Sequence, residues 1–323
     1  NGVHAVDTLD GKEYQIKSKV VVNATGVFVD DVMKMDECDT RRKVRPSQGV
    51  HLVVDSKFLG GRSALMIPKT KDGRVLFGVP WHGKVVLGTT DTPLNEASLE
   101  PRALEEEVDF ILDQAGQYLD RKPTRADVLS IFAGLRPLAA PTHADSKKTK
   151  EISRNHKIYR SKSGLLTITG GKWTTYRAMA EDVINQAIVI GGLSPAECVT
   201  KNLRVHGYTK EQFDENDWNY VYGSDASKIQ KMIEKEPSFA EKLYEGYTFT
   251  AAHVVWAARE EFAQNIEDVL ARRVRMLFLD ARAALKIAPK VASVLAAELG
   301  KDKTWEQAQI ADFNRLARGY ILN

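Results

Sequence analysis

Several features that would point to common functional classes are missing from this sequence. It has two cysteines, Cys38 and Cys198, and no Cys-x-x-Cys pair, so it offers no ligand set for a zinc or iron–sulfur centre. We therefore predict no metal site. So few cysteines are typical of a reducing compartment, although the sequence also allows one disulfide between Cys38 and Cys198. The apolar runs are far shorter than the ~20 residues that span a bilayer, and we find no signal-peptide pattern.

A strong excess of one charge is also missing. The 46 basic and 43 acidic residues leave a net charge of +3, whereas a nucleic-acid binder carries a concentrated basic face. We therefore predict no nucleic-acid partner. The 43% hydrophobic and 28% charged content is that of a globular protein, and 323 residues correspond to roughly two domains.

Both common nucleotide-binding loops are absent. None of the 22 glycines lies two positions from another, which excludes Gly-x-Gly-x-x-Gly, and Gly171-Lys172 is followed by Trp173 rather than Ser or Thr. Residues outside this sequence must therefore complete any dinucleotide site. The chain starts at Asn1 within a strand-like pattern, so we expect that an amino-terminal part of the natural protein is missing.

The patterns that are present divide the chain into a sheet-rich first part and a helical second part. An Asp-Gly turn joins two alternating segments, 3–6 and 14–16, and the apolar run 20–22 has the pattern of a buried parallel strand. We expect further strands at 50–54, 64–67, 74–79, 85–87, 128–132 and 165–169, and helices at 101–118 and from about 174 to 190. Beyond a linker, helices are expected at 227–243 with a break at Pro237, and at 251–262, 266–285, 289–299 and 305–317.

The predicted fold class is a mixed α/β (α+β) protein. Residues 1–36 and 164–193 would form the remnant of a nucleotide-binding domain. Residues 37–163 would form a substrate-binding domain around an antiparallel sheet, and residues 194–323 an all-α carboxy-terminal domain.

The strongest local signal lies at Gly170-Gly171-Lys172, between a predicted strand and a helix that starts near Thr174. Glycines let a ligand approach the backbone, and a helix amino terminus favours an electron-rich group. An ordinary tight turn with a surface lysine is an equally good explanation. The segment 23–26 (Asn-Ala-Thr-Gly) gives a weaker signal of the same kind, because ligands of open sheets sit at the carboxyl ends of strands.

Two arginines and one histidine are further candidates. Arg136, on a predicted turn at 134–137, and Arg154 could each form a bidentate pair with phosphate or carboxylate, or else a structural ion pair. With Lys172 they would form an anion pocket. His51 could act as a general base, although a structural histidine is the more frequent case. Residues 89–92 are expected to cap a turn rather than to line a pocket.

Taken together, these segments resemble the FAD-dependent, quinone-linked glycerol-3-phosphate dehydrogenases. The order and spacing of the segments carry the resemblance, which covers nearly the whole chain. The matching segments are 21–26, 45–51, 67–68, 87–92, 133–138, 152–156, 169–177, 260–263 and 267–273.

The resemblance implies an oxidoreductase of glycerol metabolism and respiratory electron transfer. It would oxidise sn-glycerol 3-phosphate to dihydroxyacetone phosphate by hydride transfer to N5 of FAD, and the electrons would pass to a quinone. The implied catalytic residues are His51, Arg136 and Lys172, and Arg154 and Arg136 would hold the substrate phosphate. The implied FAD-binding residues are Ala24, Thr25, Gly26, Gly170, Gly171, Lys172 and Thr174.

Further expectations concern partners and location. We expect a cytoplasmic protein, with peripheral contact to the inner face of the cytoplasmic membrane and a homodimer both left open. Because the family's front segment carries the Gly-rich loop, we expect this chain alone to bind FAD poorly and to turn over little substrate.

Two other interpretations are retained. One is a D-amino-acid- or glycine-oxidase-like flavoprotein, which would not need three cations aimed at a phosphate. The other is a non-catalytic module for assembly or membrane contact, with a basic patch at Arg272, Arg273, Arg275 and Arg282. We prefer the explanation that these arginines pair with nearby acidic residues.

Overall fold

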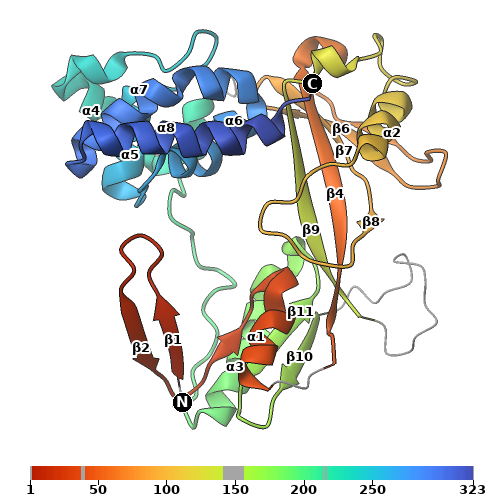
Figure 1. Ribbon diagram of the computed structural model, residues 1–323, viewed down its shortest axis with the longest axis vertical. Coiled ribbons are helices and arrows are strands. Elements are labelled where there is room, and N and C mark those ends of the chain that lie inside the picture. The colour runs from red at the N-terminus through yellow and green to blue at the C-terminus, as the bar shows by residue number, and fades with distance from the viewer. Residues whose placement is uncertain (1, 38–40, 141–155, 213, 215–216, 323) are drawn as a thin grey trace. The chain divides into compact units, whose positions relative to one another are not determined.

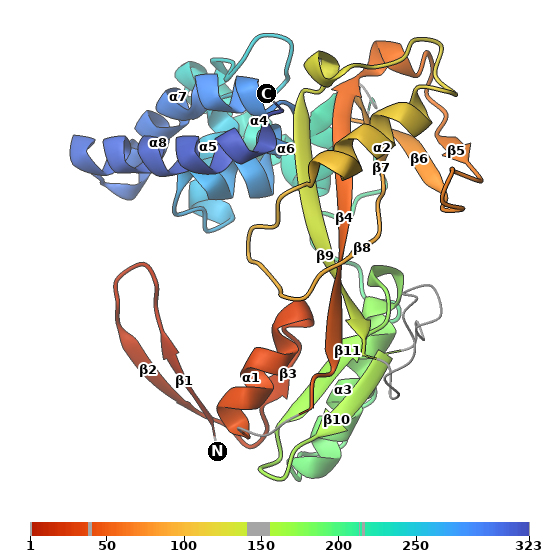
Figure 2. The same cartoon turned by 45° about the vertical axis from the view of Figure 1, so that its right-hand side comes forward.

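The computed structural model describes residues 2–37, 41–140, 156–212, 214 and 217–322 (Figures 1 and 2). Its contacts divide the chain into two compact units, which are taken one at a time below. Unit 1 comprises Asn1–Gly49, Asp91–Pro101 and Gly134–Leu203, and unit 2 comprises Val50–Thr90, Arg102–Ala133 and Arg204–Asn323.

The first element of unit 1 is the predicted hairpin. Strands β1 (Gly2–Val6) and β2 (Glu13–Lys17) pair antiparallel, with Val3 opposite Ile16. The turn between them contains Gly11 in the left-handed region, at φ 74°, which a residue with a side chain adopts at a cost. The prediction of a hairpin from alternation and an Asp-Gly turn is confirmed.

The second sheet of unit 1 has the strand order β10-β11-β3, with bounds His156–Arg160, Leu166–Gly170 and Val22–Asn23. β11 pairs antiparallel with β10 and parallel with β3. Helices α1 (Val29–Asp36) and α3 (Tyr176–Ile190) both contact β11 (Figure 1). This confirms the prediction of a parallel strand ending near residue 23.

The apolar core of this sheet lies between β11 and α3. Leu166 and Ile168 pack against Val183 and Ala187, and alternate residues of β11 point the other way. α3 begins at Tyr176, two residues later than expected, because residues 173–175 form a short 3₁₀ turn. Burial on one face only is typical of a helix that covers a single sheet.

The larger sheet has the order β5-β6-β7-β4-β8, with β9 paired to β4. Its bounds are β4 Val44–Asp55, β5 Leu65–Ile67, β6 Leu76–Trp81, β7 Lys84–Gly88, β8 Thr92–Pro93 and β9 Ser130–Ala139. The antiparallel pairs β5–β6, β6–β7 and β7–β4 confirm the expected antiparallel sheet. β4 and β9 each continue across the limits of the two units.

Helix α2 (Glu105–Ala115) covers part of this sheet in unit 2. Val108 and Ile111 are buried in the same cluster as Val50, Leu52 and Val54 of β4. Every second residue of the strand thus packs in one core with residues three apart on one face of α2. The helix starts at Glu105 rather than at Pro101, which therefore does not occupy a first helical position.

The remaining helices of unit 2 gather around one large apolar core, except α4, which packs in a smaller cluster with Tyr222, Ala252 and Trp256 (Figure 1). They are α4 Ala226–Lys235, α5 Ala251–Glu260, α6 Met276–Leu279, α7 Ala281–Leu299 and α8 Lys303–Ala317, with a π-helical turn at Asp268–Arg273. A helix was expected to begin at Pro289, but Pro289 lies inside α7. The buried Ala288 and Val291 on either side of it show that packing overrides the local cost of proline. In the described part of the chain, no helix has both the length and the apolar character to cross a bilayer.

Hydrogen bonds join this helical region to the sheet of unit 2. Ser130 Oγ donates to the carbonyl of Leu277 at 2.7 Å, and Arg282 Nη1 donates to the carbonyl of Val128 at 3.0 Å. Sequence patterns report the type of each element but not such long-range bonds. The boundaries of the two contact units therefore differ from those of the three predicted domains. The division into three domains stays a prediction.

His253 in α5 should make the stability of unit 2 depend on pH. Its side chain is 1% exposed; Nδ1 accepts a hydrogen bond from the Thr250 N–H at 3.0 Å, and Nε2 lies 2.6 Å from Asn219 Oδ1. Burial lowers the pKa of His253 to about 4. Between about pH 6.5 and about pH 4 the unfolded chain takes up a proton that the folded chain excludes. The free energy of unfolding therefore decreases by up to about 3 kcal/mol as the pH is lowered through this range.

Urea unfolding near neutral pH and near pH 4.5 tests this expectation. The stability advantage of the native chain over His253→Gln should shrink by about 2 kcal/mol or more on acidification. The same substitution at the exposed His4 should show no such change. An advantage of His253 that is equal at both pH values would show that the residue does not exclude a proton.

Candidate functional site

Two loops of unit 1 leave the sheet at the same edge. The parallel register places Leu166 opposite Val22 and Thr167 opposite Asn23. β3 ends at Asn23, whereas β11 continues past Thr167 to Gly170, so the segments 24–26 and 171–172 leave the carboxyl ends of two adjacent parallel strands at the same edge of the sheet. This is the place where open α/β sheets bind ligands. Sequence reasoning had selected both segments separately, and the structure brings them together.

The amide of Asn23 organises the first loop. Asn23 is 2% exposed, and its Nδ2 donates to the carbonyl of Val29 at 2.9 Å and to Thr167 Oγ1 at 3.3 Å. Its Oδ1 accepts a bond from Thr25 Oγ1 at 2.7 Å. One side chain thus ties the end of β3 to β11 and to the start of α1. We had not predicted this role; an asparagine directly after a buried apolar strand was its only signal.

The second loop depends on two successive glycines. Gly170 and Gly171 have φ values of 77° and 73°, in the left-handed region that side chains disfavour. A Cβ added at Gly171 would lie 2.5 Å from Met179 Sδ. The end of the flexible Met179 side chain would have to shift to admit a side chain here, and the positive φ disfavours one in addition.

The helix that follows starts with exposed groups. Lys172 N–H donates to Thr175 Oγ1 at 3.3 Å, and that hydroxyl donates back to the carbonyl of Lys172 at 2.9 Å. Trp173 is 85% exposed and stacks on Tyr176 with ring centroids 5.3 Å apart. The side chain of Lys172 makes no ion pair with any described residue. An exposed aromatic pair and a cation therefore stand directly after the glycines, together with Thr174.

Arg136 lies within strand β9, not on the turn that we expected. Its Nη1 is 3.8 Å from Asp91 Oδ1, and Asp91 also accepts a hydrogen bond from Ser47 Oγ. The guanidinium lies over the backbone of Gly49, where an added Cβ would be 2.4 Å from Nη2. Gly49 thus leaves the space that Arg136 occupies. Arg136 therefore forms a long ion pair with Asp91, which was the structural alternative to an anion-binding role.

His51 belongs to unit 2 and projects from β4 on the side opposite the buried Val50 and Leu52, as alternation predicted. Its ring stacks on Phe132 at 5.2 Å, and the opposite residue on β7 is Gly88. A Cβ at Gly88 would lie 2.4 Å from His51 Cδ2. A glycine and an aromatic ring therefore fix the orientation of the imidazole.

Residues 89–92 do not cap a turn as expected but contribute to a buried network. Thr90 Oγ1 accepts a bond from the Val50 N–H at 3.0 Å and donates to Glu107 Oε1 at 2.8 Å. Glu107 Oε2 accepts a bond from the Leu104 N–H at 3.0 Å. These bonds link β4 to the start of α2 in unit 2.

The remaining candidates are only partly placed. Arg154 lies outside the described residues, so the predicted pocket of three cations stays a prediction. Across the described residues, no group of three or more His, Cys, Asp or Glu side chains could hold a metal ion.

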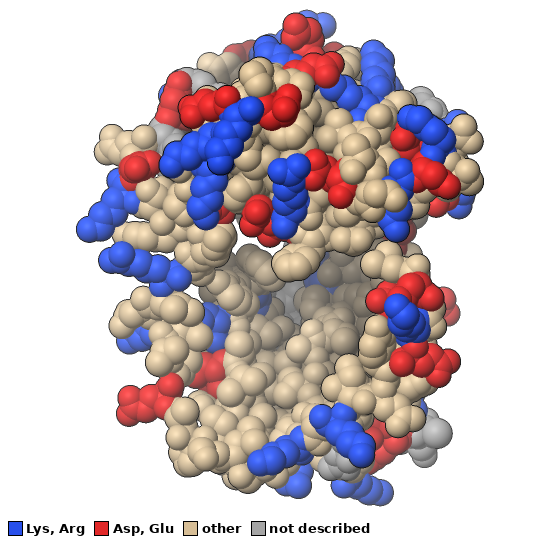
Figure 3. All heavy atoms as spheres, turned by 90° about the vertical axis from the view of Figure 1, so that its left-hand side faces the viewer, with Lys and Arg blue, Asp and Glu red and all other residues tan. Residues whose placement is uncertain are grey.

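Two of the four arginines of the predicted basic patch, Arg272 and Arg273, are paired with acidic residues as we preferred, whereas Arg282 donates to backbone carbonyls and Arg275 makes no ion pair with a described residue. Arg272 Nη2 lies 2.5 Å from Glu267 Oε1, and Arg273 Nε lies 3.9 Å from Glu261 Oε2. On the face drawn in Figure 3, acidic and basic side chains are interspersed. Such pairing offers no concentrated basic patch at Arg272 and Arg273.

Comparison with known proteins is consistent with this geometry. The model of the FAD dependent oxidoreductase family matches residues 1–177. The chain belongs to the FAD-dependent oxidoreductase family. A second model, the C-terminal domain of alpha-glycerophosphate oxidase, matches residues 166–307. The two matches correspond to the sheet-rich and helical parts of this family member.

Relatives and one solved structure extend the match over the whole chain. The mitochondrial glycerol-3-phosphate dehydrogenase SDP6 of Arabidopsis thaliana is 38% identical over 96% of this chain and 53% of the relative, and that of Bos taurus is 35% identical over 96% and 45%. The glycerol-3-phosphate dehydrogenase of Bacillus halodurans, solved with FAD, superposes with a TM-score of 0.83 at 28% identity, over 99% of this chain and 66% of that one. The chain thus spans about half the length of the curated relatives that it matches.

Replacement of Gly171 by alanine should destabilise unit 1 more than the same change at Gly192. Both residues have positive φ, at 73° and 57°, but only Gly171 would clash, since nothing lies within 4 Å of a Cβ at Gly192. We expect a loss of about 1 kcal/mol for Gly192→Ala and of about 2 kcal/mol for Gly171→Ala in urea unfolding, because Met179 must shift in the second variant. Equal losses would contradict the packing role of Gly171.

Proposed function

We propose that this chain is part of an FAD-dependent enzyme that oxidises sn-glycerol 3-phosphate to dihydroxyacetone phosphate and passes the electrons to a quinone. The observation that carries the proposal is the pair of left-handed glycines, 170 and 171, at the end of β11 beside the end of the parallel strand β3. The names of the relatives, all glycerol-3-phosphate dehydrogenases, support the choice of substrate.

The residues at this edge fit a flavin in part. Thr169 is 2% exposed, and its Oγ1 has no hydrogen-bond partner among the described residues, so a polar atom next to Gly170 is left for a ligand. The residues that would hold FAD are Ala24, Thr25, Gly26, Gly170, Gly171, Lys172 and Thr174. FAD, when bound, supplies the acceptor for the hydride that leaves C2 of the substrate.

The substrate roles fall to charged groups of this chain. Arg136, placed by Asp91 and Gly49, would hold substrate oxygens, and its planar fork suits a phosphate. Lys172 would add a second positive charge, and Arg154 would bind the phosphoryl group. His51 would accept the proton of the C2 hydroxyl at a ring nitrogen.

The chain by itself should hold little flavin. It lacks Gly-x-Gly-x-x-Gly, whose backbone approaches the pyrophosphate in dinucleotide folds. We expect the purified chain to be nearly colourless and to show no substrate-dependent dye reduction. The visible flavin absorbance of the purified chain measures this directly, and a nearly stoichiometric yellow cofactor would contradict the expectation.

The complete protein that contains this chain should be reduced by glycerol 3-phosphate and not by small amino acids. Arg136→Gln should lower kcat/KM by about 10²-fold or more, since it removes a charged partner of the substrate phosphate. Arg125→Gln is the matched control, because Arg125 is paired with Glu105 and Asp109 in unit 2. Steady-state kinetics with both substrate classes decide the matter. Reduction by glycine or alanine instead would favour the amino-acid-oxidase interpretation.

A further inference from the structure

Unit 2 contains a polar cavity that the proposed function does not use. Its volume is about 380 Å³, within the range of small-molecule sites. The lining residues come from the β6–β7 turn, the 3₁₀ helix Trp218–Asp225, the end of α5 and the segment before α6. Those that matter below are His82, His206, Tyr222, Asp225, Glu261, Arg272, Arg273 and Arg275.

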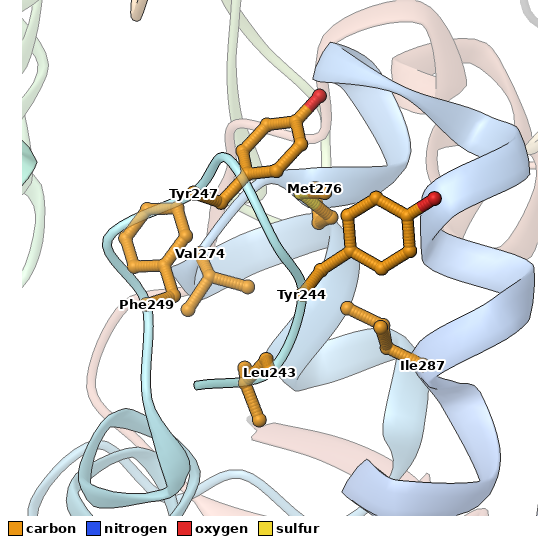
Figure 4. A pocket seen from close by; sticks show the side chains of 7 residues that line it. All are labelled: Leu243, Tyr244, Tyr247, Phe249, Val274, Met276 and Ile287. Carbon is orange, nitrogen blue, oxygen red and sulfur yellow. The ribbon is translucent and has the colours of Figure 1, made fainter. Parts of the chain in front are cut away.

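The neighbouring apolar pocket differs sharply from this cavity. Leu243, Tyr244, Tyr247, Phe249, Val274, Met276 and Ile287 line it (Figure 4). It has no space for a water-sized probe, so it is a packing gap in the helical core. Of these two neighbours, the polar cavity is the one with room for a ligand.

Among the described residues, four residues that line the cavity each have a buried side-chain atom without a hydrogen bond: the Tyr222 hydroxyl, His82 Nδ1, Asp225 Oδ1 and Glu261 Oε2. Tyr222 is 8% exposed, and among the described residues its hydroxyl makes no hydrogen bond; the same is true of His82 Nδ1. Such groups cost free energy unless a water or a ligand satisfies them. The imidazole of His82 is held in place by stacking on Tyr220 and by an edge contact with Trp218.

The charges around the cavity leave one cation available. Asp225 pairs with Lys228 at 2.8 Å, and its Oδ2 lies 2.5 Å from His206 Nε2. Arg275, in contrast, makes no ion pair within the described part of the chain.

The other charges are accounted for by internal pairs. Arg272 pairs with Glu267 and Asp268, and Arg273 pairs with Glu261. Burial raises the pKa of Glu261, which weakens its repulsion of an anion. The cations around the cavity therefore equal the carboxylates in number, and Arg275 is distinguished by the absence of an ion pair to any described residue.

The backbone of Arg275 is fixed in an uncommon conformation. Its φ of 56° lies in the left-handed region, directly before α6, although arginine carries a Cβ that disfavours this region. Arg275 is near enough to His82 for its charge to add to burial in lowering the pKa of that imidazole. Arg275 and His82 therefore line the same cavity.

We propose that this cavity binds a small organic phosphate, with Arg275 as the charged partner of the phosphoryl group and Tyr222 and His82 as its hydrogen-bonding partners. A guanidinium fork with two further polar groups suits a group with three acceptor oxygens. The site lies wholly in unit 2, whereas Arg136 and Lys172 lie in unit 1. It is independent of the proposed flavin and substrate roles.

Calorimetric titration of the full chain with inorganic phosphate, at constant ionic strength set with sodium chloride, tests the proposal. Native chain should show saturable binding. Arg275→Asn should weaken it by about tenfold or more, because asparagine tolerates the left-handed backbone but removes the charge. Tyr222→Phe should weaken it by about threefold to tenfold. Arg275→Lys should restore part of the affinity.

Two controls separate this site from others. Arg315→Gln removes an exposed arginine elsewhere in unit 2 and should leave binding unchanged. The double variant Arg136→Gln, Lys172→Gln removes the cations proposed for the substrate and should still bind phosphate. Circular dichroism melting of each variant confirms that it is folded.

Three results would overturn the proposal. They are the absence of saturable binding to the native chain, binding that survives Arg275→Asn in a folded protein, and binding that disappears in the double variant alone. None of them depends on flavin or turnover, so they leave the proposed function to its own tests.

Discussion

The parallel pairing of β3 with β11 is the constraint on which the rest of the candidate site depends. It is short, with Val22 and Asn23 opposite Leu166 and Thr167, and it joins segments that are 144 residues apart in sequence. The buried amide of Asn23 reinforces it by bonding to β11 and to the start of α1 at once. Without this pairing, nothing would hold the two glycine-containing loops at the same edge of the sheet.

A second constraint is the use of glycine to make room for functional side chains. Gly49 leaves the space occupied by the guanidinium of Arg136, and Gly88 leaves space for the ring of His51. In both cases the glycine has an ordinary φ, and its value lies in the missing Cβ rather than in backbone freedom. Each is a close-approach position of the kind that packing demands.

Much of the fold could be predicted from the sequence, because local patterns encode it. The hairpin of β1 and β2, the antiparallel strands from β4 to β7 and most helices follow from alternation, turn residues and helical periodicity. The misses have one cause in common. Arg136 was placed on a turn because of Gly134 and Pro137, and α7 was split at Pro289, whereas long-range pairing and burial override such local signals.

The candidate site could be predicted only residue by residue. Sequence reasoning found Gly170, Gly171 and the segment 24–26, since strand ends with glycine are visible locally. It could not find the amide network of Asn23 or the polar cavity around Tyr222, because these depend on contacts between distant segments. Nor could it foresee that the sheet of unit 2 and the helical region would share one unit.

Hydrogen–deuterium exchange of the complete protein, with and without FAD, tests the central claim most directly. If the ends of β3 and β11 form part of the flavin site, the amides of residues 24–26 and 170–173 should exchange more slowly when FAD is bound. Protection elsewhere in the protein with no change in these two segments would contradict the account.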